Sequence, residues 1–158
     1  MPDTIFTVGH GRERFEAIAA LLDAVGVGTL IDVRSAPYSR NAPDFSRPEL
    51  DRRCSAAGIG YRFLGQHLGG RPSNPALQGP DGEPDFEHIA ATPGFDADIG
   101  LLMELAAGGP VAILCAEEDP ARCHRATLLA PALVARRARV AHLRHDGSVE
   151  MHQEALGI

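Results

Sequence analysis

Short apolar runs alternate with segments of helical periodicity along most of this chain. Each apolar run has the length of a buried strand, and the runs cover residues 5–8, 29–34, 61–64, 111–115 and 140–143. The segments between them place apolar side chains at the spacing of a helix, over residues 15–25, 48–57, 86–91, 95–107 and 120–138. Strands that alternate with helices form a mostly parallel sheet with helices on both faces. We therefore expect a three-layer α/β sandwich.

The connections favour the strand order 3-2-1-4-5 in a five-stranded sheet. Right-handed crossovers restrict the possible strand orders. The long connection over residues 65–110 gives the chain room to cross back past the first strand. Within that connection, the Gly/Pro-rich residues 69–84 are typical of a loop and a candidate lid. Residues 144–148 have the composition of a hairpin turn, so residues 149–151 are expected to add a short antiparallel edge. The length of 158 residues and the hydrophobic content of 44% fit one domain over residues 1–158.

The composition excludes several classes of protein. A net charge of −6 argues against general nucleic-acid binding, because phosphate affinity depends on basic surface. No apolar segment approaches the roughly 20 residues that span a bilayer, and the N-terminus lacks the pattern of an export signal. The three cysteines, an odd number, favour reduced thiols over a disulfide framework. We therefore expect a cytoplasmic protein that does not bind membranes.

The basic residues are of one type, because all 15 are arginine and none is lysine. This excludes a Schiff-base lysine and the lysine of a phosphate-binding loop of the Walker type. An anion site in this chain must therefore be built from arginine side chains and backbone amides.

Polar side chains follow the ends of three predicted strands. His10 follows the first strand, Asp32 and Arg34 end the second, and Cys115 and Glu117 follow the fourth. Ligands of such sheets bind at the carboxyl ends of the strands, at the point where the strand order reverses. With the first and fourth strands as neighbours, we expect these side chains to converge on one crevice.

Residues 111–125 form the stretch richest in reactive side chains. The apolar run is followed by a loop and then by Asp119 and Pro120, which are typical of a helix N-cap and first helical residue. A helix start leaves unpaired backbone N–H groups and a partial positive charge, which favour a bound anion and lower the pKa of a nearby thiol. The side chains within reach of this field are Cys115, Cys123, His124 and Arg125.

These residues suggest a thiol-dependent enzyme, a transferase or hydrolase, that binds a small anionic or nucleotide-derived ligand. Cys115 is the expected nucleophile or sulfur carrier, His10 the proton-transfer partner, and Asp32 the residue that orients His10. Glu117 completes the expected catalytic set. The expected ligand-binding residues are Arg34, Arg71, Cys123, His124 and Arg125.

Structural interpretations of the same residues remain open. Cys115 also fits a small apolar residue that closes a buried strand. Arg34 also fits an ion pair with Asp32 or Glu117, although strand alternation separates Asp32 from Arg34 unless the strand has already ended. The spacing from Cys115 to Arg122 is one residue longer than in a phosphatase-like loop, which argues against phosphatase and rhodanese chemistry.

Two other classes of function also remain open. The first is a non-catalytic module that binds a nucleotide or a partner. The second is a metal site, for which Cys115, Cys123 and His10 are the candidate ligands, although the chain has no Cys-x-x-Cys pair. Cys123 and His124 are neighbours in a predicted helix, where their side chains point about 100° apart and do not favour a shared ion. We therefore predict no metal or other cofactor.

Four spaced motifs resemble a known family. They are Thr7-Val8-Gly9-His10, Asp32-Val33-Arg34, Leu68-Gly69-Gly70-Arg71, and the segment from Cys115-Ala116-Glu117 through Pro120 to Cys123-His124-Arg125. Together they resemble the bacterial and archaeal family called domain of unknown function 488. The resemblance implies a fold and a set of site positions but supplies no reaction. Family members usually have Gly-His-Ser where this chain has Gly9-His10-Gly11, so one candidate ligand-binding hydroxyl is absent here.

Overall fold

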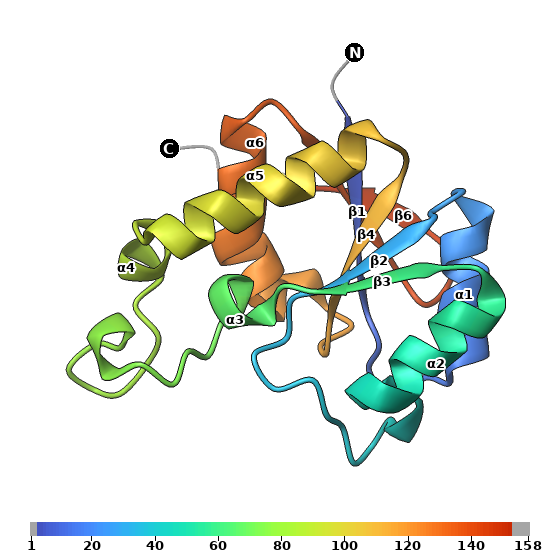
Figure 1. The fold of residues 1–158 in the computed structure, drawn as a ribbon, viewed down its shortest axis with the longest axis horizontal. Coiled ribbons are helices and arrows are strands. Elements are labelled where there is room, and N and C mark those ends of the chain that lie inside the picture. The colour runs from blue at the N-terminus through green and yellow to red at the C-terminus, as the bar shows by residue number, and fades with distance from the viewer. Residues whose placement is uncertain (1–2, 153–158) are drawn as a thin grey trace.

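The computed structural model describes residues 3–152, which fold around one six-stranded sheet (Figure 1). The strands are β1 (Thr4–Gly9), β2 (Thr29–Asp32), β3 (Gly60–Phe63), β4 (Val111–Cys115), β5 (Arg139–Leu143) and β6 (Val149–Met151). They lie in the order β3-β2-β4-β1-β5-β6, with β6 antiparallel to β5 and the other pairs parallel. The predicted mostly parallel α/β sheet with an antiparallel edge is confirmed.

The predicted strand order 3-2-1-4-5 is wrong in one place, because β4 lies between β2 and β1. Val111 of β4 lies opposite Thr29 on β2 and opposite Ile5 on β1. All five residues of β4 are apolar and buried, as expected of a central strand. Right-handed crossovers allow both orders, so connection lengths alone do not decide on which side of β1 the fourth strand lies. The adjacency on which the crevice depends is confirmed, with Val8 beside Leu114.

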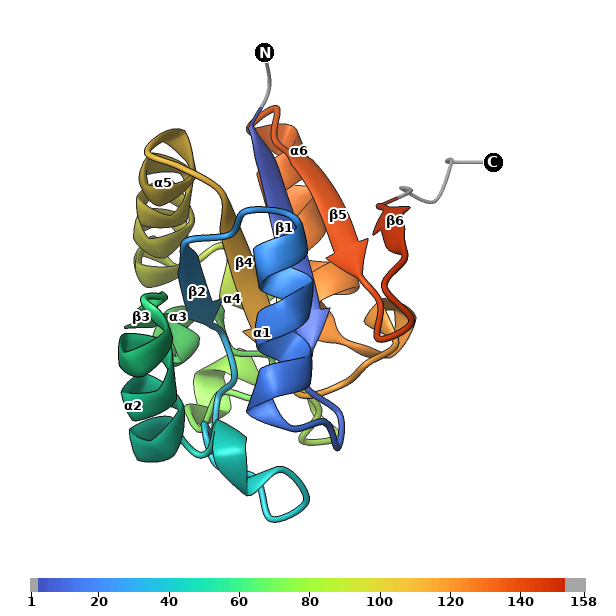
Figure 2. The same cartoon turned by 90° about the vertical axis from the view of Figure 1, so that its right-hand side faces the viewer.

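Helices cover both faces of the sheet and give the molecule three layers (Figure 2). They are α1 (Phe15–Ala24), α2 (Arg47–Ala57), α3 (Gly65–Leu68), α4 (Phe86–Ala90), α5 (Pro93–Ala107) and α6 (Ala130–Ala135). α1 and α2 share one core, which includes Leu50 and Leu114, and α5 and α6 share the other, which includes Leu102 and Ile113. Neighbouring residues of β4 therefore enter opposite cores, as strand alternation requires. Within residues 3–152, none of the helices combines the length and apolarity needed to cross a membrane.

The predicted helix over residues 120–138 begins later than its start signal. Asp119 caps a short 3-10 turn, Pro120–Arg122, and Cys123 then has extended backbone. An aspartate followed by proline starts such a turn as readily as it starts a regular helix, so the pattern does not separate the two. Cys123 therefore lies outside the helix.

The helix itself starts after His124 with a wide first turn. Arg125–Leu129 has π-type hydrogen bonds, and α6 continues the helix to Ala135. Pro131 has no N–H group to complete the regular backbone bond, which favours a wider turn immediately before it. The helix ends at Ala135 with Arg136 as its C-cap, short of the predicted end at residue 138.

Candidate functional site

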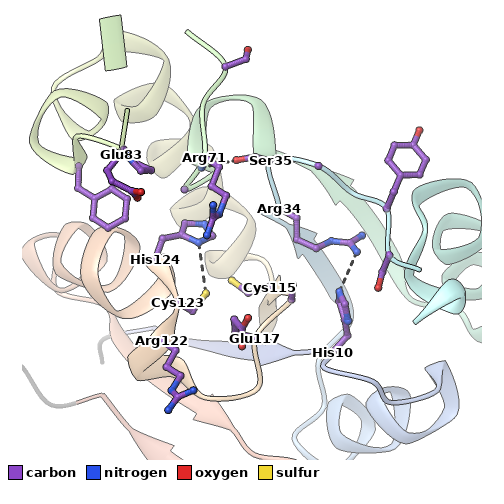
Figure 3. Close-up of a pocket in the computed structure, with 18 residues that line it drawn as sticks. His10, Arg34, Ser35, Arg71, Glu83, Cys115, Glu117, Arg122, Cys123 and His124 are labelled. Carbon is purple, nitrogen blue, oxygen red and sulfur yellow. Dashed lines mark hydrogen bonds between the residues drawn. The ribbon is translucent and has the colours of Figure 1, made fainter. Parts of the chain in front are cut away.

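A pocket of about 660 Å³ lies at the carboxyl ends of β1, β2 and β4 (Figure 3). Strand ends contribute His10 after β1, Arg34 after β2 and Cys115 on β4. The loop after β4 and the segment that contains Arg71 and Phe86 supply further lining residues. The pocket is therefore at the edge of the sheet where the strand pattern predicts a crevice.

The loop after β4 runs directly over the end of β1. The backbone N–H of His10 donates to the carbonyl of Cys115 at 3.0 Å. A Cβ atom on Gly9 would lie 1.6 Å from the carbonyl oxygen of Glu117. Only glycine allows this approach, so Gly9 determines how closely the loop packs on β1.

Two thiols and an imidazole form a cluster in the pocket (Figure 3). The Sγ atoms of Cys115 and Cys123 and a ring nitrogen of His124 all lie within 4.8 Å of one another. The Sγ atom of Cys123 is 3.6 Å from Nδ1 of His124. We call these three residues the Cys-Cys-His cluster. Cys123 and His124 are expected from the sequence to lie in a helix with diverging side chains, and the late start of the helix brings the two side chains together instead.

The two thiols of the cluster differ in acidity. Burial raises the pKa of Cys115 well above its usual range, since this residue is only 1% exposed. A hydrogen bond donated by the Cys115 thiol lowers the pKa of Cys123, and His124 lowers it further. These shifts make Cys123 the more acidic thiol of the pair, and the expected role of Cys115 as the nucleophile stays a prediction.

Asp32 and Arg34 form a buried bidentate ion pair at the end of β2. Nε and Nη2 of Arg34 each donate to a carboxylate oxygen of Asp32 at 2.8 Å, and the side chains are 5% and 0% exposed. The hydroxyl of Tyr61 donates to the same carboxylate at 2.6 Å. β2 ends at Asp32, so strand alternation no longer separates the two charges. Of the two partners considered for Arg34, the structure shows Asp32.

His10 lies between Arg34 and the ring of Phe45. Its Nδ1 donates to the carbonyl of Gly11 at 2.9 Å, and its Nε2 faces Nη1 of Arg34 at 3.3 Å. The imidazole stacks on Phe45 with ring centroids 4.9 Å apart. Burial, together with the Arg34 cation, lowers the pKa of His10 to about 4. The expectation that Asp32 orients His10 is therefore wrong, because Asp32 holds Arg34 and a neutral His10 accepts from Arg34.

Arg125 is buried and does not line the pocket. It is 1% exposed, and its Nη2 donates to the carbonyls of Glu117 and Glu118 at 2.7 and 2.6 Å. The carbonyls of the preceding loop engage only Nη2 of Arg125, so the expected ligand-binding role of this residue stays a prediction. Its contacts fix the conformation of the loop between Cys115 and Cys123.

Arg71 and Glu117 both line the pocket, as the sequence analysis expects. The backbone N–H of Arg71 donates to Oγ of Ser35 at 2.9 Å, which ties the long loop to the segment after β2. The side chain of Arg71 extends beside His124 (Figure 3). Glu117 is exposed at the same pocket. These two residues therefore add one positive and one negative charge to the lining.

The structure adds lining residues that the sequence analysis does not assign to the site. They include Arg122, Glu83 and Phe86. Arg122 belongs to the same sequence motif as Cys123, so this motif could have identified Arg122 as a residue of the site. No local sequence pattern indicates that Glu83 or Phe86 belongs to the site. These two residues reach the pocket only because of the path that the long loop takes.

Unsatisfied polar atoms gather beside the cluster. Among residues 3–152, the buried side-chain nitrogen and oxygen atoms without a hydrogen-bond partner are Nε2 of His124 and Nε and Nη1 of Arg125. Buried polar groups are nearly always paired, so unpaired ones are candidates for a functional role. A Cβ atom on Gly70 would lie 2.7 Å from Cγ of His124, so the backbone of the long loop packs directly on the imidazole. Close packing therefore helps to hold the His124 ring in the pocket.

The fold and the pocket define an α/β protein with sulfur and imidazole groups at the carboxyl ends of its strands. A family model described as Domain of unknown function DUF488 matches residues 14–131. The chain belongs to this family, which confirms the resemblance of its motifs. The matched range includes the Cys-Cys-His cluster, whereas His10 precedes it. Comparisons with curated proteins and with solved structures give no match.

Proposed function

We propose that the protein is an enzyme that binds a small anionic molecule in the pocket and transfers or hydrolyses one of its groups at the Cys-Cys-His cluster. One observation carries this proposal. Arg34, whose guanidinium is held by Asp32, lines the same pocket as the two thiols and the imidazole. A binding group for an anion and a set of reactive groups therefore face one ligand.

Arg34 is well placed to bind an anion. A guanidinium has more N–H groups than the three that Arg34 uses on Asp32 and His10. Because Asp32 already holds the side chain, little conformational entropy is lost when a ligand binds. Arg71 supplies a second guanidinium from the long loop, and two arginines are a typical recognition set for phosphate, sulfate or carboxylate.

Cys123 and Glu117 are the residues best placed for chemistry. Cys123 is the more accessible of the two thiols in the cluster and lies against His124. Glu117 lines the same pocket with an exposed carboxyl group, which suits a proton acceptor or donor. Cys115 and His10 are positioning residues. Cys115 acts through its contact with Cys123, and His10 acts through its contact with Arg34.

Anion binding predicts that phosphate, sulfate or pyrophosphate raises the melting temperature. A site with ligand at about 100 times its Kd gains about 2.7 kcal/mol of stability. Arg71→Ala is expected to reduce the shift, because it removes an exposed guanidinium from the pocket without disturbing the core. Arg139→Ala is the matched control, since Arg139 is exposed at the start of β5, at the opposite end of the sheet. Thermal unfolding, monitored by circular dichroism, measures the anion-dependent shift in melting temperature for both variants.

The outcomes distinguish the possible functions. No shift with any of the three anions, or an equal shift in Arg71→Ala, would contradict the anion site. Esters of the anion that binds are then assayed for hydrolysis, with Cys123→Ser expected to be inactive. Stabilisation without turnover would indicate a non-catalytic binding module instead of an enzyme.

A further inference from the structure

We propose that the Cys-Cys-His cluster binds one zinc ion and leaves the fourth coordination position open to the pocket. This inference deepens the proposed function, on which it rests, by naming the cofactor of the same site. Three observations carry it: the spacing of the donor atoms, the backbone that presents them, and the chemistry of the donor set.

The donor atoms are spaced as in a tetrahedral zinc site. Zinc binds a thiolate at about 2.3 Å and an imidazole nitrogen at about 2.0–2.1 Å, so a tetrahedral angle places these two donors about 3.6 Å apart. The Sγ atom of Cys123 lies 3.6 Å from Nδ1 of His124. The Sγ atom of Cys115 lies within 4.8 Å of Sγ of Cys123 and of a ring nitrogen of His124, and two thiolates on one zinc are about 3.8 Å apart. Small side-chain rotations therefore complete a triangle of three ligands.

Two consecutive residues reach one ion because the backbone changes conformation between them. Cys123 is extended, with φ −132° and ψ 149°, whereas His124 has helical angles of −62° and −15°. The divergence of neighbouring side chains in a helix therefore does not apply here. Arg125 holds the preceding loop through two carbonyls, and the backbone of Gly70 packs on the His124 ring. The structure thus positions the donors without help from an ion.

The donor set selects zinc over magnesium and calcium. Thiolates and imidazole suit zinc, whereas magnesium and calcium prefer oxygen ligands. Cys115 and Cys123 are free thiols and not a disulfide. Within residues 3–152, no fourth His, Cys, Asp or Glu joins this group. Three protein ligands are typical of a zinc site that keeps a position for water or substrate, whereas structural zinc sites have four.

The open position places the ion where the anion binds. All three ligands line the pocket that also contains Arg34 and Arg71. An ion at such a position polarises an oxygen atom of the substrate or lowers the pKa of a bound water. His10, considered with the two cysteines from the sequence, is not part of this group, because its ring contacts Arg34 and Phe45. His124 takes its place.

Metal analysis of the full chain tests the proposal. The protein is expressed with zinc in the medium, purified without a chelator or a metal-affinity tag, and analysed by inductively coupled plasma mass spectrometry. We expect about one zinc per chain. Cys123→Ser and His124→Ala are each expected to lose it. Cys54→Ala and His88→Ala are expected to keep it, because Cys54 lies in the opposite core and His88 is exposed on α4.

Cobalt substitution of the wild-type chain adds a readout that does not depend on a variant that folds poorly. Thiolate ligation in a tetrahedral site gives cobalt(II) strong visible absorption and a sulfur-to-metal charge-transfer band. Gly70→Ala is expected to change this spectrum, because its added methyl group displaces the His124 ring, whereas all three donor residues are retained. An unchanged spectrum would count against His124 as a ligand.

Two results would overturn the zinc site: a wild-type chain without zinc, or folded Cys123→Ser and His124→Ala variants that retain it. Phosphate stabilisation of the chelator-treated protein separates this failure from failure of the proposed function. If stabilisation persists where no zinc binds, the anion site stands and the ion is excluded. If phosphate stabilises neither the zinc-loaded nor the chelator-treated protein, although the chain binds zinc, the metal site stands and the anion site is excluded.

Discussion

Replacing Asp32 by asparagine is expected to lower the free energy of unfolding by about 3–5 kcal/mol, the usual cost of leaving a buried charge without its partner. The Arg34 side chain is 5% exposed, and two of its nitrogen atoms donate to Asp32. Asparagine keeps the size of the side chain and removes its charge, so the loss reports on the ion pair and not on packing. Urea unfolding at neutral pH measures this effect.

Glu49→Gln is the matched control for this substitution. Glu49 pairs with Arg52 and Arg53 on the surface of α2, and exposed ion pairs contribute little to stability. We therefore expect a much smaller change at Glu49 than at Asp32. Equal losses at the two positions would argue against a rigid Arg34 and thus against a preformed anion site.

Gly9→Ala is expected to destabilise the protein by about 3 kcal/mol, the upper end of the usual cost of overpacking. The added methyl group would lie 1.6 Å from the carbonyl oxygen of Glu117, so the backbone of the loop has to move. That movement also breaks the hydrogen bond that Arg125 donates to the same carbonyl. Thermal unfolding measures the loss, and we expect the variant to lose the anion-dependent shift as well.

Gly28→Ala provides the comparison for a harmless methyl group. A Cβ atom at Gly28 meets nothing within 4 Å, and the backbone of Gly28 does not have positive φ. We therefore expect little change in stability there. A Gly9→Ala variant as stable as Gly28→Ala would show that the loop does not pack on β1 as described.

The position of the pocket is predictable from the sequence because it depends on strand direction alone. The apolar runs at residues 5–8 and 111–115 identify β1 and β4, and parallel strands bring their carboxyl ends to one edge of the sheet. His10 and Cys115 are thus placed at the pocket without knowledge of any side-chain contact. The strand order is not predictable in this way, because insertion of β4 between β2 and β1 depends on packing across the whole sheet.

The roles of individual side chains depend on contacts that local patterns do not encode. Asp32 is expected from the sequence to orient His10, but the end of β2 allows Arg34 to turn back onto the Asp32 carboxylate. Helical geometry would separate the side chains of Cys123 and His124, but the helix begins after His124 and not at the preceding start signal. Both differences depend on the exact residue at which a strand ends or a helix begins. Sequence patterns locate such boundaries least well.

Alkylation of Cys123 in the presence of an anion tests most directly whether the anion site and the thiols share one pocket. Chelator-treated protein is reacted with iodoacetamide, a neutral reagent, and peptide mass spectrometry follows labelling at Cys54, Cys115 and Cys123. We expect Cys123 to be labelled first, because the other two thiols are buried. We also expect pyrophosphate to slow this labelling in the wild type and not in Arg71→Ala. A labelling rate at Cys123 that pyrophosphate leaves unchanged in the wild type would contradict the shared pocket.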